Sequence, residues 1–172
     1  KTLRQKNNLL KEWRGSKNID DMLEVWDAGL AKEGAILISK RLAYVKTLND
    51  SASRFHTAIS SDSEKLTLSY ESFADLSELS AEDIEKALAD GIRRAREKDK
   101  ELGYSTVGPH RDDIRIEING KDSRKFASQG QQRTIALALK LGEVVIYKNE
   151  IGEPPVLLLD DVLSELDINR QN

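Results

Sequence analysis

Several residue types are missing or scarce in this chain of 172 residues, and each absence excludes a class of protein. The sequence contains no cysteine, which excludes a disulfide-bonded scaffold and fits a reducing cytoplasm. No apolar run approaches the roughly 20 residues that a membrane-spanning helix needs. The first residues also lack the pattern of a secretion signal. We therefore expect a soluble, cytoplasmic protein with no contact to a membrane.

An excess of positive charge is lacking as well. The chain has 27 basic and 30 acidic residues, so its formal net charge is −3. Proteins that bind nucleic acids without specificity gain affinity by neutralising phosphates, and they are usually basic. Any contact of this chain with DNA must therefore be local. The length allows one ordinary domain or two small ones.

The first part of the chain has the apolar spacing of helices. Residues 1–13 are amphipathic, and a second helix is expected from the cap residue Asn18 to about Ile59. Its apolar stripe consists of Ile19, Leu23, Trp26, Leu30, Leu37, Tyr44, Leu48, Phe55 and Ile59. The recurrence at steps of three and four, or their sums, predicts one long helix.

Two further elements complete this helical part. Residues 66–70 alternate apolar with polar side chains, which predicts a strand with one solvated face. A third helix is expected between the cap residue Ser80 and the stop residue Gly103. We therefore expect residues 1–103 to form a mainly helical arm domain.

After Gly103 the pattern changes to strands and helices. The segment Asp113–Gly120 alternates isoleucine with polar residues and ends in an Asn-Gly turn dipeptide, which predicts a strand pair. An apolar helix is expected from about Gln131 to Tyr147, and the apolar run Val156–Leu159 predicts a strand covered on both faces. The fold class is α/β, with residues 104–172 as a second domain.

Two acidic residues, Asp160 and Asp161, follow this apolar run directly. Four hydrophobic residues ending in acids have the form of a Walker B strand. Ligands gather at the carboxyl ends of strands in open parallel sheets, where one carboxylate can hold Mg²⁺ and its neighbour can orient an attacking water. A buried strand with two acids in its exit loop is the alternative interpretation.

The segment FASQGQQRT, residues 126–134, opens the apolar helix with polar side chains. Ser128 is a good N-cap, Gly130 permits close approach of a ligand, and the helix beginning near Gln131 presents free amides and a positive dipole end. Ser128-Gln129-Gly130-Gln131 has the spacing of the Ser-Gly-Gly-Gln signature of ABC-type ATPases, with glutamine in place of the first glycine. The pattern predicts a phosphate-binding turn, and a polar cap on a core helix is the alternative.

The order of these motifs carries a family resemblance. A signature-like helix start precedes a Walker B-like strand, and Ser164–Asp167 stands in the position of a D-loop. With GPHRDD at residues 108–113, the chain resembles the RecF family of SMC-like, ABC-type ATPases in bacterial recombinational repair. The match is specific over about Gly103–Asp167 and weaker over the helical part.

The resemblance implies a split ATPase head in which ATP lies between two protomers. The residues that it places at the nucleotide are Ser128, Gln129, Gly130, Gln131 and Asp167. It further implies that Asp160 serves Mg²⁺ and that Asp161 takes the place of the catalytic acid. Most ABC-type ATPases have glutamate there, and the shorter aspartate fits a slow, switch-like hydrolysis.

The P-loop pattern G-x-x-x-x-G-K-[ST] does not occur in the chain. Two pairs of glycines have its spacing, but alanine or proline follows where the lysine belongs. Without that lysine, Asp160 has no bound nucleotide to act on. We therefore predict that this chain alone neither binds ATP tightly nor hydrolyses it, and the resemblance places the P-loop before Lys1.

A group of basic residues lies towards the end of the third expected helix. The candidate DNA contacts among them are Arg93, Arg94, Arg96 and Lys98. Clustered cations give local affinity for phosphates, but acidic residues are interleaved and no aromatic residue accompanies them, which favours a solvated helix face. For His110 and Arg111 in GPHRDD the sequence indicates no particular chemistry.

The resemblance implies the activity of a complete protein of which this chain is a fragment. Such a protein binds double-stranded and gapped DNA as an ATP-dependent homodimer and helps RecR and RecO load RecA. Two alternatives remain: a non-catalytic module that binds a partner such as RecR through its arm, and the half of another SMC-like or transporter ATPase. The length of the arm disfavours a transporter.

Overall fold

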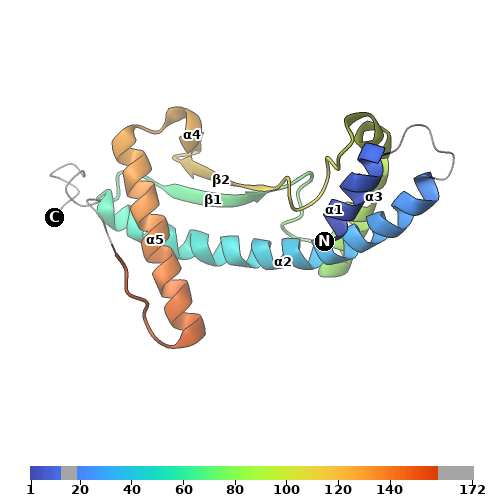
Figure 1. Cartoon of the computed structure of the whole chain (residues 1–172). Helices are drawn as coiled ribbons and strands as arrows, with labels where there is room; N and C mark the ends of the chain where they lie inside the picture. The colour runs from blue at the N-terminus through green and yellow to red at the C-terminus, as the bar shows by residue number, and fades with distance from the viewer. Residues whose placement is uncertain (13–18, 159–172) are drawn as a thin grey trace. The chain divides into compact units, whose positions relative to one another are not determined.

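The computed structural model describes residues 1–12 and 19–158 of the chain (Figure 1). The elements in chain order are α1 (Thr2–Glu12), α2 (Ile19–Ile59), β1 (Leu66–Glu71), α3 (Ala81–Leu102), β2 (Asp113–Ile118), β3 (Lys121–Asp122), α4 (Ser123–Phe126) and α5 (Gln129–Ile151). The fold is therefore a mixture of helices and one small sheet, and the long helix predicted to end near Ile59 is confirmed.

Two compact units make up the chain, and each is assembled from two separate stretches. The first unit contains residues 1–42 and 70–113, and the second contains residues 43–69 and the chain from Ile114 onward. The helix α2 is continuous through both units. Neither unit is therefore one continuous segment of the chain.

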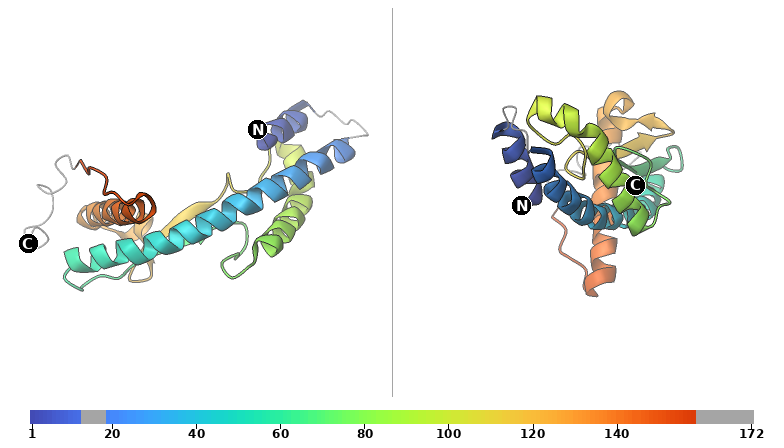
Figure 2. Two further views of the ribbon diagram at one scale, coloured as in Figure 1. Left: turned by 90° about the horizontal axis from the view of Figure 1, so that it is seen from below. Right: turned by 90° about the vertical axis from the view of Figure 1, so that its right-hand side faces the viewer.

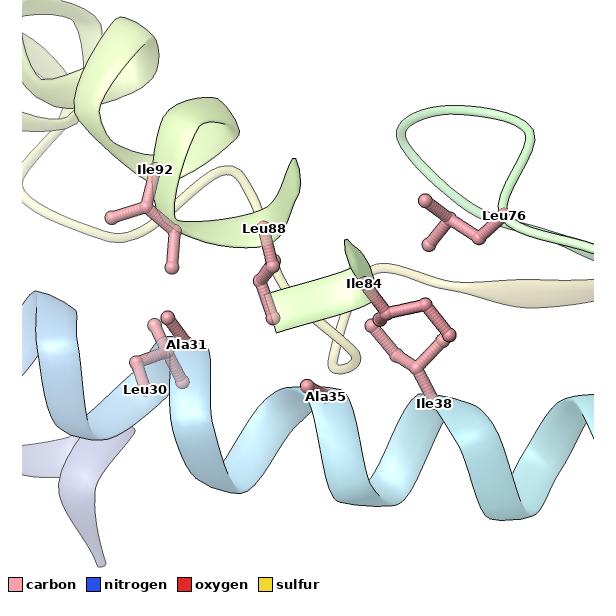
Figure 3. Packing of buried hydrophobic residues seen from close by; sticks show 8 residues of the cluster. All are labelled: Leu30, Ala31, Ala35, Ile38, Leu76, Ile84, Leu88 and Ile92. Carbon is pink, nitrogen blue, oxygen red and sulfur yellow. The ribbon is translucent and has the colours of Figure 1, made fainter. Parts of the chain in front are cut away.

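An apolar core between α2 and α3 holds the first unit together (Figure 3). Its buried members are Leu30, Ala31, Ala35, Ile38, Leu76, Ile84, Leu88 and Ile92. The helical members recur mostly three or four residues apart, so that one face of each helix carries them. Gly34 lies where the helices approach closely, because a Cβ atom there would be only 2.6 Å from Cδ2 of Leu88.

The apolar stripe of α2 differs from the predicted one at two positions. Leu37 and Tyr44 are 42% and 41% exposed, whereas their neighbours Ile38 and Val45 are buried. A step of seven residues falls about 20° short of two helical turns. Starting from Leu30, two such steps rotate Leu37 and then Tyr44 away from the buried face. The predicted stripe therefore included two side chains that the structure leaves exposed.

A buried network of charges joins α1, α2 and α3 within the first unit. Nζ of Lys6 lies 2.9 Å from Oδ1 of Asp27 and 3.1 Å from Oδ2 of Asp99, and Lys6 and Asp99 are fully buried. Arg96 reaches the other oxygen of Asp27 at 2.9 Å. Thr106 donates to Asp99 through its backbone N–H and its hydroxyl. Each buried charge is thus compensated, as burial of ions requires.

The second unit contains a three-stranded sheet in the order β1-β2-β3. Strands β2 and β3 are antiparallel, with Glu117 opposite Asp122 and Ile118 opposite Lys121. Asn119 and Gly120 join them with φ angles of 50° and 74°, the positive values that a tight hairpin turn requires. The strand pair predicted from the Asn-Gly dipeptide is confirmed.

Helix α5 packs against the second half of α2 (Figure 1, Figure 2). Gly142 makes the contact close, since a Cβ atom there would lie 3.1 Å from the backbone nitrogen of Ala52 and 3.2 Å from Cδ1 of Leu48. Ala138, one turn earlier on α5, is fully buried. The contact fixes α5 on α2 inside the second unit.

The strand predicted over Val156–Leu159 is wrong for the residues that the structure describes. Val156–Leu158 belong to no strand, and Val156 and Leu158 are each 88% exposed. A strand forms only where a neighbouring strand takes up its backbone hydrogen bonds, and none of the three described strands pairs with this segment.

Among the described helices, none combines the length and the apolar character needed to cross a membrane.

Candidate functional site

The candidate site is the start of α5, where a reciprocal pair of hydrogen bonds caps the helix. Oγ of Ser128 accepts a bond of 3.2 Å from the backbone N–H of Gln131, and Oε1 of Gln131 accepts one of 2.8 Å from the backbone N–H of Ser128. This is a capping box. The predicted N-cap role of Ser128 is confirmed, and the helix begins two residues before the predicted Gln131.

The helix itself provides no acceptor for two backbone amides at its start. Gln129 and Gly130 are the first two residues of α5, and amides in the first turn have no acceptor within their own helix. Ser128 and Gln129 are exposed, and Gly130 is half-buried. Amides at the positive end of a helix dipole suit an anion, and phosphate oxygens are such anions. The geometry of the four residues 128–131 therefore fits a phosphate group.

The side chain of Gln131 has a second partner that the sequence did not indicate. Its Nε2 donates a hydrogen bond of 2.9 Å to Oε1 of Glu64, a residue 67 positions earlier. The other carboxylate oxygen of Glu64 lies 3.6 Å from Nε2 of His56, which is fully buried in α2. No local pattern could have revealed this contact, because only the fold brings the turn after α2 to the start of α5.

A hollow of about 230 Å³ lies beside this helix start, within the second unit. Its lining comes from the β2–β3 hairpin, from α4 and from the first turn of α5, and includes Lys121, Ser123, Phe126 and Gln131. Phe126 is 68% exposed. The hollow therefore offers a cation, hydroxyl and amide groups and an aromatic ring next to the capped turn.

The acidic candidates Asp160, Asp161 and Asp167 lie outside the described residues. Within residues 1–12 and 19–158, no group of three or more acidic, histidine or cysteine side chains is arranged to hold a metal ion. The predicted site for Mg²⁺ thus depends on the part of the chain that follows Leu158.

The GPHRDD segment, in the first unit, is held by polar contacts. The carboxylate of Asp112 accepts hydrogen bonds from the hydroxyls of Tyr70 and Ser72, and Arg41 donates to the carbonyl oxygen of Pro109 and to the Tyr70 hydroxyl. The pKa of Tyr70 is raised to about 12, with burial as the largest cause; the hydrogen bond from Arg41 lowers this pKa, and the hydrogen bond to Asp112 and its charge raise it. These contacts fix the loop against α2 and β1.

His110 and Arg111 have structural partners as well. Nε2 of His110 lies 3.0 Å from the carbonyl oxygen of Ser105, and the guanidinium of Arg111 donates to the same oxygen. Arg111 also lies over the ring of Tyr104, 4.8 Å from its centroid. The structure thus assigns both residues contacts within the loop.

The four candidate DNA contacts on α3 have different surroundings. Arg96 belongs to the buried charge network through Asp27, and Arg93 pairs with Asp90 one turn away. Arg94 and Lys98 are exposed on the helix surface. The structure therefore does not bring the four cations together as one surface free of acidic partners.

No family model matches the sequence. Comparison with curated proteins finds relatives described as "DNA replication and repair protein RecF". The relative from Agathobacter rectalis is 48% identical over 172 residues, which is 100% of this chain and 45% of that protein. The relative from Halothermothrix orenii is 45% identical over 173 residues, covering 99% of this chain and 46% of that protein.

Solved structures agree with this relationship. A structure described as the recombination mediator protein RecF-ATP in the RecFOR pathway matches with a TM-score of 0.86 and 44% identity over 99% of this chain and 45% of that chain. A structure of the same protein with ATPrS matches with the same TM-score over 98% of this chain. The chain spans less than half the length of these relatives. Over its own length, it belongs to the RecF family of DNA replication and repair proteins.

Proposed function

We propose that this chain is the signature-bearing part of an ATP-dependent DNA-repair clamp of the RecF type. The observation that carries the proposal is the exposed start of α5, where Ser128, Gln129, Gly130 and Gln131 present a hydroxyl and free amides. These groups would donate hydrogen bonds to the γ-phosphate of ATP that a second copy of the protein holds. The matching solved structures, whose descriptions name ATP and ATPrS, support a nucleotide in the complete protein.

The acidic residues after Leu158 would complete this site. Asp160 would hold Mg²⁺, because carboxylate oxygens are the ligands that this ion prefers. Asp161 would orient the attacking water, and Asp167 would lie at the seam between the two copies. ATP supplies the phosphoryl group when bound, and the role of this chain is to position the γ-phosphate and the water.

The chain by itself would lack the other half of the nucleotide site. The lysine of a P-loop, which holds the β- and γ-phosphates, occurs in no G-x-x-x-x-G-K pattern of this sequence. We therefore expect no ATP turnover from the isolated chain. Turnover should appear when a separately made segment that carries the P-loop of the same protein is added.

In the complete protein, closure of two copies around ATP would hold double-stranded DNA near a single-strand gap. The RecFOR pathway named for the related structures supports a role beside RecO and RecR, which together would load RecA. The DNA surface would include the exposed cations Arg94 and Lys98 of α3. Such a DNA-repair protein would act in the cytoplasm.

ATP-driven dimerisation of the complete protein tests the proposal. In Ser128→Arg a bulky cation replaces the capping hydroxyl, and we expect light scattering to show no dimer on addition of ATP while each monomer still binds ATP. Ser80→Arg is the matched control, because Ser80 caps α3 with similar backbone angles and belongs to the first unit, whereas the proposed site belongs to the second. Dimerisation of Ser128→Arg at the wild-type ATP concentration would refute the role of the α5 start.

The catalytic assignment has its own variant. In Asp161→Asn the amide cannot act as a base, and loss of such a group costs about 100-fold or more in turnover. We expect ATP-driven dimerisation to persist in this variant while phosphate release nearly stops. Unchanged release would remove Asp161 from the catalytic role.

A further inference from the structure

The turn between α2 and β1 holds a carboxylate against the start of α5. Glu64 lies in this turn, and the backbone of the next residue, Lys65, is bonded in both directions to Asn119 of the β2–β3 hairpin, at 2.8 and 2.9 Å. Ser63 closes the same turn by donating to the carbonyl oxygen of Ser60. The position of Glu64 is thus set by its neighbours in the chain.

The contact with Glu64 determines which way the Gln131 amide points. A carboxylate only accepts hydrogen bonds, so it faces the NH₂ end of that amide. Nε2 of Gln131 donates to Glu64 at 2.9 Å, which turns Oε1 towards the backbone N–H of Ser128 at 2.8 Å. If the amide were reversed, its oxygen would face the carboxylate and its NH₂ group would face a backbone N–H, and both contacts would be repulsive.

We propose that Glu64 is a positioning residue for the nucleotide-binding turn, acting through Gln131. By holding Gln131 in the capping box, Glu64 keeps the amides of Gln129 and Gly130 directed outwards at the place where phosphate binds. The inference rests on the proposed function of the α5 start. It extends that function by making the turn at the end of α2, through residues 56 and 64, part of the site.

The surroundings of Glu64 support an ordered contact. Its side chain is only 11% exposed, and the fully buried His56 lies on its other side at 3.6 Å. A carboxylate in such a place is held from two sides, and hydrogen bonds to a charged group are stronger than bonds between neutral groups. The cost of breaking the contact is therefore larger than for an exposed surface pair.

A double-mutant cycle in the complete protein tests the proposal. The quantity measured is the ATP concentration that gives half-maximal dimerisation in wild type, Glu64→Ala, Gln131→Ala and the double variant. Loss of one charge-assisted hydrogen bond corresponds to about a tenfold change in an equilibrium. We expect Glu64→Ala to raise the required ATP concentration by about tenfold, and to have less than about a twofold effect once Gln131 is already alanine.

A purely structural role of Glu64 predicts a different result. In that case Glu64→Ala lowers the midpoint of thermal unfolding and weakens dimerisation equally in both backgrounds, which would overturn the inference. Asp62→Asn is the matched control, since Asp62 is an exposed acid of the same turn and asparagine tolerates its φ of 60°. We expect this control to dimerise like wild type.

Two further outcomes distinguish a failure of the role of Glu64 from a failure of the proposed function of the α5 start. If wild type forms no dimer with ATP, the proposed function fails and the inference fails with it. If wild type dimerises and Glu64→Ala needs the same ATP concentration, only the inference fails. Should Glu64→Ala not fold, Glu64→Gln replaces it. A rise of about threefold in the ATP concentration for half-maximal dimerisation that disappears in the Gln131→Ala background supports the proposal. An equal rise in both backgrounds refutes it.

Discussion

Replacing Lys6 by methionine should destabilise the first unit more than any exposed charge substitution. The Nζ atom of Lys6 is fully buried between Asp27 and Asp99, at 2.9 and 3.1 Å. Removing one partner of a buried ion pair costs about 3–5 kcal/mol, because the remaining charge stays buried without compensation. Asp99 keeps its bonds from Thr106 and Asp27 keeps Arg96, so we expect the lower end, about 3 kcal/mol.

Urea denaturation followed by circular dichroism measures this loss of unfolding free energy. For a chain of this length, about 3 kcal/mol corresponds to a fall of roughly 6–12 °C in the melting temperature. Lys140→Met is the control, because Lys140 forms a 2.9 Å pair with Glu143 on the exposed face of α5, where such pairs contribute about 0–1 kcal/mol. A Lys6→Met chain no less stable than Lys140→Met would refute the view that the network needs its central cation.

Two further predictions concern packing and pH. Gly142→Val should lower the unfolding free energy by about 1–3 kcal/mol, because its Cβ would press on the backbone of α2 at Ala52, whereas Ala136→Val on the exposed side of the same helix should have little effect. The pKa of Tyr70, raised to about 12, means that the folded state keeps the phenol proton longer than the unfolded state. This contribution to stability is fully present below pH 10 and is lost as the pH rises towards 12. In Tyr70→Phe, the unfolding free energy measured by urea denaturation should therefore fall less steeply between pH 10 and pH 12 than in wild type. An unchanged slope of unfolding free energy against pH would contradict the raised pKa of Tyr70.

Much of the secondary structure could be predicted because its causes are local. Ser80 and Ser128 each bond to an amide three residues later, and Gly103 ends α3 with a φ of 74° that glycine adopts without strain. The Asn119-Gly120 turn likewise follows from two residues with positive φ. Such features depend on neighbours within one turn of chain, so the sequence contains the necessary information.

Local sequence patterns gave wrong predictions where the interacting residues are far apart in the chain. The apolar run Val156–Leu159 has the pattern of a buried strand, yet Val156 and Leu158 are exposed, since burial requires covering elements that the pattern itself does not specify. The choice between Leu37 and Ile38 for the buried face of α2 likewise depended on where α3 packs.

The sequence by itself determined the helices α1, α2, α3 and α5, the capped start of α5 and the resemblance to an ATPase signature. Only the tertiary structure decided which groups support that signature and which charges are buried. Glu64 meets Gln131 across 67 positions, and Lys6 meets Asp99 across 93. Hydrogen bonds and ion pairs act over a few ångströms in space whatever the separation along the chain, so contacts of this kind become visible only once the fold has brought their residues together.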